Sequence, residues 1–148
     1  MRVHGYMSQT EPWHYGKEVE DITAKYIHLR YSMLPYIYSH AAEVSFSGST
    51  LMRPLVMDFP DDRQALEQKH LFMFGKSLLV APVTEPSVSR WSVYLPENAA
   101  GWVDFWSGKK YRGGQTTEVD IDLAKIPLFV KGGSIFPFSF GKQYASEC

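Results

Sequence analysis

Apolar residues in the first third of the chain recur with the period of a helix. Between Glu18 and about Ser47, large or apolar side chains lie three or four positions apart, at Ile22, Tyr26, Leu29, Met33, Ile37 and Ala41. Such a stripe covers one face of an amphipathic helix. Pro35 predicts a kink or a break within this helix, and Gly48 predicts its end.

After Gly48 the pattern changes to short apolar runs separated by turn residues. The runs are LVMDF (55–59), SLLVAPV (77–83), WSVYLP (91–96), GWVDFW (101–106), TEVDID (117–122), PLFVK (127–131) and SIFPF (134–138). One helical stretch, roughly residues 63–74, separates the first two runs. Short strands at this spacing predict an antiparallel sandwich or a small barrel. The sequence therefore predicts a helical start followed by a β domain, with the boundary near residues 48–53.

The first residues, MRVH, alternate as a strand does, so that Arg2 and His4 project from one face. Strand exits hold the active sites of α/β barrels, which makes His4 a candidate site residue. The alternative is a histidine whose ring is satisfied by nearby backbone groups.

In the loop that follows, Glu11 and Trp13 suit sugar binding, because sugar faces stack on aromatic rings and hydroxyls need acceptors. A buried tryptophan that anchors the loop is the alternative there.

Three aspartates, Asp58, Asp61 and Asp62, surround a Phe-Pro turn. Paired carboxylates can act as acid and nucleophile in glycosidases or bind Ca²⁺. The spacing in DFPDD is not that of a calcium loop, and we expect Asp61 and Asp62 to cap the next helix.

The β part also contains three tryptophans, Trp91, Trp102 and Trp106. They could form a platform for carbohydrate or pack in the core. The glycine pairs 113–114 and 132–133 fit hairpin turns. The sequence contains no phosphate-binding glycine loop, HExxH motif or CxxC motif. No complete catalytic set is visible from the residues alone.

Composition narrows the function classes. The 148 residues are 45% hydrophobic and 21% charged, as in an ordinary globular chain. Lys and Arg number 15 against 16 Asp and Glu, which gives no broad attraction to nucleic acid or to an anionic membrane. A single cysteine, Cys148, excludes an internal disulfide and a cysteine-based zinc site. No stretch approaches the roughly 20 apolar residues of a membrane span.

Seven short motifs, taken together in their order along the chain, point to one protein family. They are MRVHG, TEPWHYG, YIHLRYSMLPYIYSHA, GSTLMRPLVMDFPDD, FMFGKSLLVAPV, VYLP and GWVDFWSGKKYRGG. This series, over about residues 1–138, closely resembles glycoside hydrolase family 31, which contains α-glucosidases and α-xylosidases. The resemblance implies an α+β fragment: the last strand and helices of a (β/α)₈ barrel, residues 1–48, followed by an antiparallel β-sandwich-like domain, residues 49–148.

The resemblance also implies an activity. The family performs retaining hydrolysis, here the release of α-linked xylose or glucose from the non-reducing end of oligosaccharides, with two aspartates from earlier barrel strands. Neither aspartate motif is present in this sequence, so we expect no catalytic residue in the chain and no activity of the chain alone. The form TEPWHYG favours the α-xylosidase-like branch.

His4 matches the family histidine that binds the sugar at the cleaved bond, which implies a substrate-binding role for it. Arg2 is assigned a supporting electrostatic role, and Trp13 is a further candidate. No metal or organic cofactor is implied. The expected partners are an α-linked oligosaccharide and the rest of the parent glycosidase. A stand-alone β-sandwich module that binds carbohydrate or serves as a structural support is the alternative function.

Overall fold

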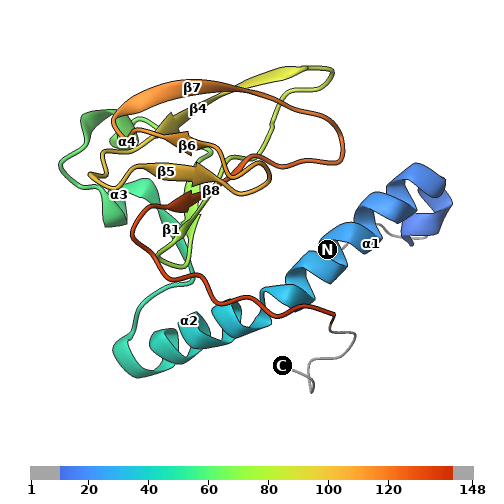
Figure 1. Ribbon diagram of the computed structural model, residues 1–148, viewed down its shortest axis with the longest axis horizontal. Helices are drawn as coiled ribbons and strands as arrows, with labels where there is room; N and C mark the ends of the chain where they lie inside the picture. Colours follow the sequence, from blue (N-terminus) through green and yellow to red (C-terminus); the bar gives the residue numbers. More distant parts are fainter. Residues whose placement is uncertain (1–10, 142–148) are drawn as a thin grey trace. The chain divides into compact units, whose positions relative to one another are not determined.

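The computed structural model describes residues 11–141 and divides them into two compact units (Figure 1). Residues 11–39 and 137–141 belong to the first unit, and residues 40–136 form the second. The predicted strand over residues 1–4 lies outside the described residues.

The first unit is helical. A short 3₁₀ helix, η1 (Pro12–Tyr15), leads into α1 (Lys17–Ser32), and α2 (Leu34–Ser47) starts in this unit. The break between α1 and α2 falls at Met33, two residues before Pro35. Proline cannot donate the helical hydrogen bond, and its ring clashes with the carbonyl four residues earlier, so the predicted break is confirmed.

The second unit contains the end of α2, two antiparallel sheets and two short helices. The larger sheet has the strand order β1-β2-β3-β8-β5-β6. Its strands are, in chain order, β1 (Met52–Pro54), β2 (Phe72–Phe74), β3 (Leu78–Val80), β5 (Trp102–Asp104), β6 (Lys110–Tyr111) and β8 (Leu128–Lys131). The smaller sheet pairs β4 (Arg90–Leu95) with β7 (Gln115–Asp120). The helices α3 (Leu55–Asp58) and α4 (Arg63–Leu66) connect β1 to β2.

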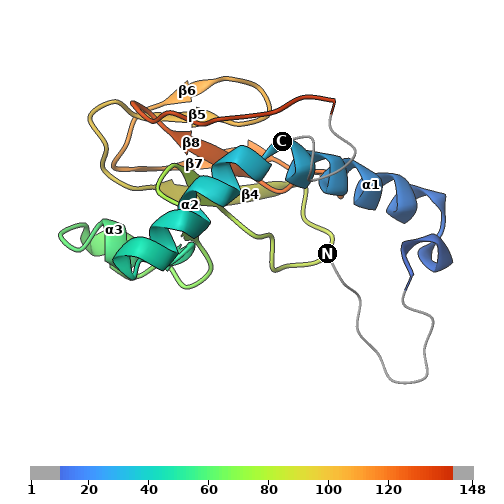
Figure 2. The same ribbon diagram turned by 90° about the horizontal axis from the view of Figure 1, so that it is seen from below.

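One hydrophobic core lies between the two sheets of this unit. Figure 2 shows β5 and β8 of the larger sheet stacked over β7 and β4 of the smaller one. Leu79 on β3 is paired with Phe129 on β8, and both side chains are fully buried. Val93 and Leu95 on β4 belong to the same buried cluster. The α+β class with antiparallel pairing is therefore confirmed.

Three of the predicted elements are wrong. The run over residues 55–59 forms the helical turn α3 rather than a strand, and periodicity cannot separate the two in so short an apolar run. The predicted helix over residues 63–74 ends at Leu66, and its last three residues form β2, which pairs with β1 and β3 on both sides. The run over residues 134–138 forms no strand. The other five runs each contain a strand.

The turn after β8 brings two backbone segments into close contact. Gly132 N–H donates to the Gly101 carbonyl at 2.8 Å. A Cβ on Gly132 would overlap the carbonyl oxygen of Ala100 and would lie 2.7 Å from that of Gly101. The glycine is therefore required by the approach of another backbone segment, a reason that the turn prediction did not contain.

We expect Gly132→Ala to lower the free energy of unfolding by about 2 kcal/mol, because the backbone around Ala100 must shift to admit a methyl group. Gly108→Ala is the control, since Gly108 has φ +71° but open space around it, and only the backbone strain of about 1 kcal/mol applies. Urea denaturation followed by circular dichroism measures both losses. If the two variants lost the same free energy, the close approach would have no energetic consequence.

Candidate functional site

Of the predicted substrate-binding residues, only Trp13 can be placed. Arg2 and His4 lie outside the described residues. Trp13 lies in η1, and its side chain is exposed (62%). His14 Nε2 lies 3.3 Å from the Glu11 carboxylate, and the His14 N–H donates to the Glu11 carbonyl at 3.0 Å. This turn holds an acid and an open aromatic face together, and the interpretation of Trp13 as a buried anchor is wrong.

The aspartates around the Phe-Pro turn have structural partners. Asp58 accepts two hydrogen bonds from Arg53 Nε, at 2.9 and 3.1 Å, and both side chains are largely buried. The pKa of Arg53 is raised, first by its hydrogen bond to Asp58. Arg53 also donates to Ser49 Oγ at 3.2 Å. This ion pair joins β1 to the end of α3, and the Asp58 carboxylate is occupied by the Arg53 guanidinium.

Asp62 joins three segments of the second unit. Its Oδ1 accepts from the backbone N–H groups of Gln64 and Ala65, both at 3.1 Å, so the predicted capping of the next helix is confirmed for Asp62. Its Oδ2 accepts from the Tyr94 hydroxyl at 2.7 Å and from the N–H of Glu97 at 3.1 Å. Asp61 is exposed and is not the capping residue.

These contacts shift two pKa values. Burial alone would raise the pKa of Asp62, but the hydrogen bonds from Tyr94 and from three backbone amides outweigh it and leave the pKa lowered. Burial, and then the carboxylate of Asp62, raise the pKa of Tyr94. A carboxylate held ionised in this way is a poor general acid. Within residues 11–141, no three His, Cys, Asp or Glu side chains are grouped to hold a metal ion.

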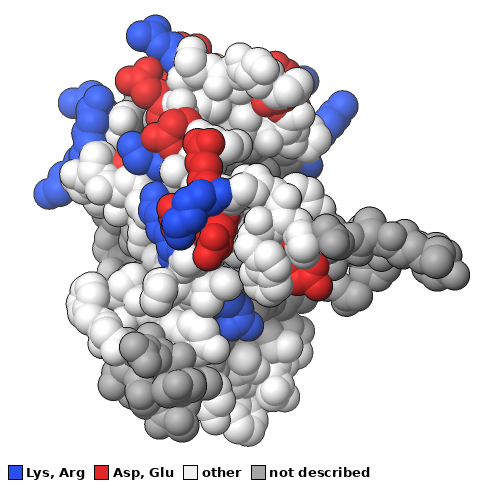
Figure 3. Space-filling view, turned by 90° about the vertical axis from the view of Figure 1, so that its right-hand side faces the viewer, with Lys and Arg blue, Asp and Glu red and all other residues white. Residues whose placement is uncertain are grey.

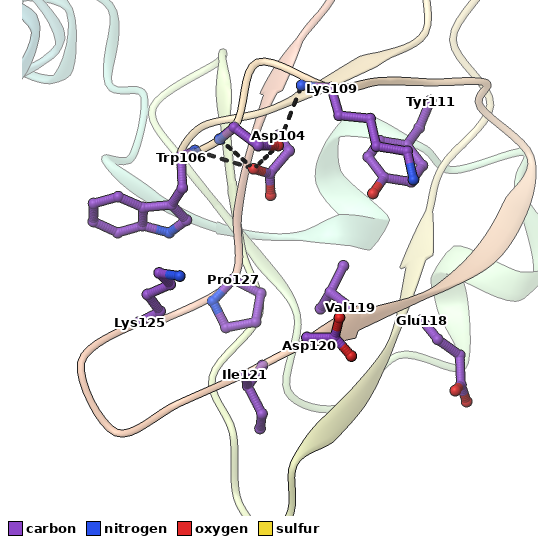
Figure 4. Close-up of a pocket in the computed structure, with 11 residues that line it drawn as sticks. Asp104, Trp106, Lys109, Tyr111, Glu118, Val119, Asp120, Ile121, Lys125 and Pro127 are labelled. Atoms are coloured by element: carbon purple, nitrogen blue, oxygen red, sulfur yellow. Dashed lines mark hydrogen bonds between the residues drawn. The ribbon is translucent and has the colours of Figure 1, made fainter.

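The three tryptophans of the β part do not form a common platform. Trp102 is fully buried, packs against Phe59 with ring centroids 6.1 Å apart, and donates from Nε1 to the Pro96 carbonyl at 2.8 Å. Trp91 packs against the same core. Trp106 lines a pocket together with residues from β7 that sequence reasoning did not connect to it (Figure 4).

Charged side chains of both signs are mixed on one face of the molecule (Figure 3), in line with the balanced composition. On the face drawn in Figure 3, acidic and basic side chains lie next to one another rather than in separate fields. Among the helices of residues 11–141, none combines the length and the apolar character needed to cross a bilayer.

Comparison with known families assigns both parts of the chain. A model of the glycosyl hydrolase family 31 C-terminal domain matches residues 48–136, and a model of the TIM-barrel domain of the same family matches residues 1–40. The first match alone covers more than half of the chain. The chain belongs to glycosyl hydrolase family 31. The two matches and the antiparallel sheets confirm the predicted fold class, a barrel end followed by a β domain.

Relatives of this family 31 chain include an α-xylosidase and an α-glucosidase. It is 46% identical to an α-xylosidase of Saccharolobus solfataricus over 137 residues, which are 93% of this chain and 19% of that enzyme. It is 40% identical to α-glucosidase 2 of Bacillus thermoamyloliquefaciens over 84% of this chain and 16% of that enzyme. A Flavobacterium johnsoniae family 31 dextranase, solved with isomaltotriose, superimposes with a TM-score of 0.83 at 39% identity, over 94% of this chain and 18% of the dextranase. The chain spans about a fifth or less of these proteins.

Proposed function

We propose that this chain supplies the end of the catalytic barrel and the proximal β domain of a retaining α-glycosidase that releases α-linked xylose or glucose from the non-reducing end of oligosaccharides. The observation that carries the proposal is the continuous 46% identity to an α-xylosidase, which runs through both parts of the chain. We place the boundary between the two parts at residues 48/49. The partners in this function are an α-linked oligosaccharide and the remainder of the glycosidase.

The roles of the residues follow from the position of the barrel end. The imidazole of His4 hydrogen-bonds a hydroxyl of the sugar next to the cleaved bond and so holds the reacting carbon in place. Arg2 supplies positive charge near the catalytic carboxylates. The exposed ring of Trp13 offers a face for the apolar side of a sugar, beside the acceptor oxygens of Glu11.

The catalytic aspartates come from the remainder of the glycosidase and not from this chain. Retaining hydrolysis needs two carboxyl groups about 5 Å apart, one of which is free to carry a proton. In the β unit, Asp58 is paired with Arg53, and Asp62 accepts four separate donor groups. Both side chains are engaged in structural contacts of the β unit.

A chimaera tests the proposal. The segment of the Saccharolobus α-xylosidase that aligns with this chain is replaced by residues 1–148, and hydrolysis of an aryl α-xyloside is measured. We expect the chimaera to remain active. We expect His4→Ala to lower its kcat/KM about tenfold, the effect of one lost substrate hydrogen bond. His70→Ala is the control, because His70 is exposed in the β unit, and it should leave kcat/KM unchanged.

Two results would contradict the proposal. The first is an active chimaera in which His4→Ala and His70→Ala behave alike, which would remove the sugar-binding role of His4. The second is hydrolysis of aryl α-xyloside or α-glucoside by the 148-residue chain alone, which would mean that the chain carries its own catalytic carboxylates. A folded but inactive chimaera, together with tight glycan binding by the chain alone, would favour the alternative of a binding module.

A further inference from the structure

A pocket of about 280 Å³ opens in the second unit between the β5–β6 hairpin, β7 and the loop that leads to β8 (Figure 4). Its volume is just below the range of about 300–1,000 Å³ that is typical of ligand sites, so it suits a small ligand or one unit of a longer one. All of its lining residues belong to the same compact unit, residues 40–136.

The charges around the pocket are mixed. Asp104, Glu118 and Asp120 contribute carboxylates, and Lys109 and Lys125 contribute ammonium groups. An anion would meet the carboxylates of Asp104 and Asp120, and a cation would meet two ammonium groups. A neutral ligand with many hydroxyl groups fits both, because each hydroxyl can donate to a carboxylate and accept from an ammonium group.

Asp104 is held in a fixed orientation. Its Oδ1 accepts from the N–H groups of Trp106 and Ser107, at 3.2 and 2.7 Å, and from Ser107 Oγ at 2.6 Å. Figure 4 shows the carboxylate pointing into the space between the rings of Trp106 and Tyr111. Within residues 11–141, neither Oδ2 of Asp104 nor the hydroxyl of Tyr111 has a hydrogen-bond partner. The pocket therefore offers an oriented acceptor and a hydroxyl that are both available to a ligand.

The two aromatic rings beside Asp104 are also fixed. Trp106 Nε1 donates to the Ile126 carbonyl at 2.8 Å, and its ring packs edge-on against Phe105 with centroids 5.1 Å apart. Tyr111 packs edge-on against Phe129 with centroids 5.6 Å apart. Rings that are already immobilised lose little conformational entropy when a ligand stacks on them.

We propose that this pocket is a carbohydrate-binding site of the β unit and that it holds one sugar residue of a neutral oligosaccharide. Asp104 Oδ2 accepts from a sugar hydroxyl, and the Tyr111 hydroxyl donates to or accepts from its neighbour. The lysines at the rim bond to hydroxyl oxygens farther out. The ring of Trp106 contacts the C–H face of the sugar, the surface for which aromatic side chains are suited.

Isomaltotriose is titrated into the ¹⁵N-labelled 148-residue chain, and amide chemical shifts are followed by NMR. The choice of this probe rests on the proposed function. We expect saturable shifts confined to residues 104–111 and 118–127. Asp104→Asn retains an acceptor for the turn but removes the charge, and Tyr111→Phe removes only the hydroxyl. Each should weaken binding about fivefold, as expected for one hydrogen bond.

Glu67→Gln, an exposed position of the same unit away from the pocket, is the matched control and should leave the affinity unchanged. Circular dichroism verifies that each variant is folded, and Tyr111→Phe keeps the ring that packs on Phe129. Absence of saturable shifts up to about 10 mM sugar, or equal binding in all three variants, would overturn the proposal. Shifts produced by inorganic phosphate but not by the sugar would also overturn it. None of these outcomes bears on the chimaera and its His4 variant.

Discussion

Trp102→Ala is expected to lower the free energy of unfolding of the β unit by about 4 kcal/mol. The indole is fully buried, and it fills the space between the two sheets next to Phe59. Truncation leaves a cavity that the strands on either side cannot close. It also leaves the buried carbonyl of Pro96 without the indole N–H that it accepts from at 2.8 Å, an additional cost of about 1–3 kcal/mol if no water replaces the donor.

Urea denaturation followed by far-ultraviolet circular dichroism measures this loss. Trp102→Phe separates the two causes, because it keeps most of the apolar volume and removes the N–H. We expect its free energy of unfolding to lie between those of the wild type and the alanine variant. Trp13→Ala is the control, since the Trp13 side chain is exposed, and it should change stability by less than about 0.5 kcal/mol. Equal losses for Trp102→Ala and Trp13→Ala would show that the core around Trp102 is not formed in solution.

The elements that the sequence predicted correctly are those whose signal is local. The stripe from Ile22 to Ala41 repeats over many turns, and Pro35 interrupts it where the backbone has no N–H to donate. Runs such as WSVYLP contain more β-branched and aromatic residues than a helix of that length favours, and the strand β4 occupies almost the same residues.

The errors occur where pairing with distant residues decides the structure. Residues 72–74 carry a helix-compatible pattern, yet Met73 lies between Arg53 on β1 and Leu79 on β3. Nothing within a few residues of Met73 encodes these two neighbours. Short apolar segments are therefore assigned by the sheet that they complete, and not by their own period.

In the candidate sites, too, only contacts between residues close in sequence could be predicted. The turn DFWSG carries a local signal, an aspartate followed by a serine three positions later, and the side chain of Asp104 does accept hydrogen bonds from Ser107. The other wall of the pocket comes from β7, which lies beyond β6 in the chain. The pairing of Asp62 with Tyr94 spans 32 positions, and capping was the only part of its role that the sequence could indicate.

The second large effect is expected at Asp62. Asp62→Ala removes the cap of α4, a loss of about 0.5–2 kcal/mol, and leaves the Tyr94 hydroxyl without its acceptor, a further 1–3 kcal/mol. We therefore expect a total loss of about 3 kcal/mol in the free energy of unfolding. Asp61→Ala is the matched control one residue away, because Asp61 is exposed and does not cap the helix, and it should be close to neutral.

The same residue should make stability depend on pH in the acid range. The pKa of Asp62 is lowered in the folded chain, so its ionised form is the one that the fold stabilises. This stabilisation is fully present above the unfolded value of about 3.9 and is lost as the pH falls through the lower folded value. The stability difference between the wild type and Asp62→Ala should therefore shrink below about pH 4, because only the wild type loses the ionic contacts. Urea denaturation of the wild type and of Asp62→Ala at a series of pH values, from neutral to acidic, measures this difference.

Tyr94→Phe tests how much the tyrosine hydroxyl contributes to the lowered pKa of Asp62. Burial of Asp62 remains in this variant while its strongest side-chain hydrogen bond is removed, so the pKa of Asp62 should rise and the loss of stability on acidification should begin at a higher pH than in the wild type. The phenylalanine ring keeps the packing of Tyr94 in the core cluster, which limits the change at neutral pH to the hydrogen bond itself. The contrary result is a stability that falls identically with acidic pH in the wild type, Tyr94→Phe and Asp62→Ala. That result would mean that other carboxylates control the acid unfolding of the β unit.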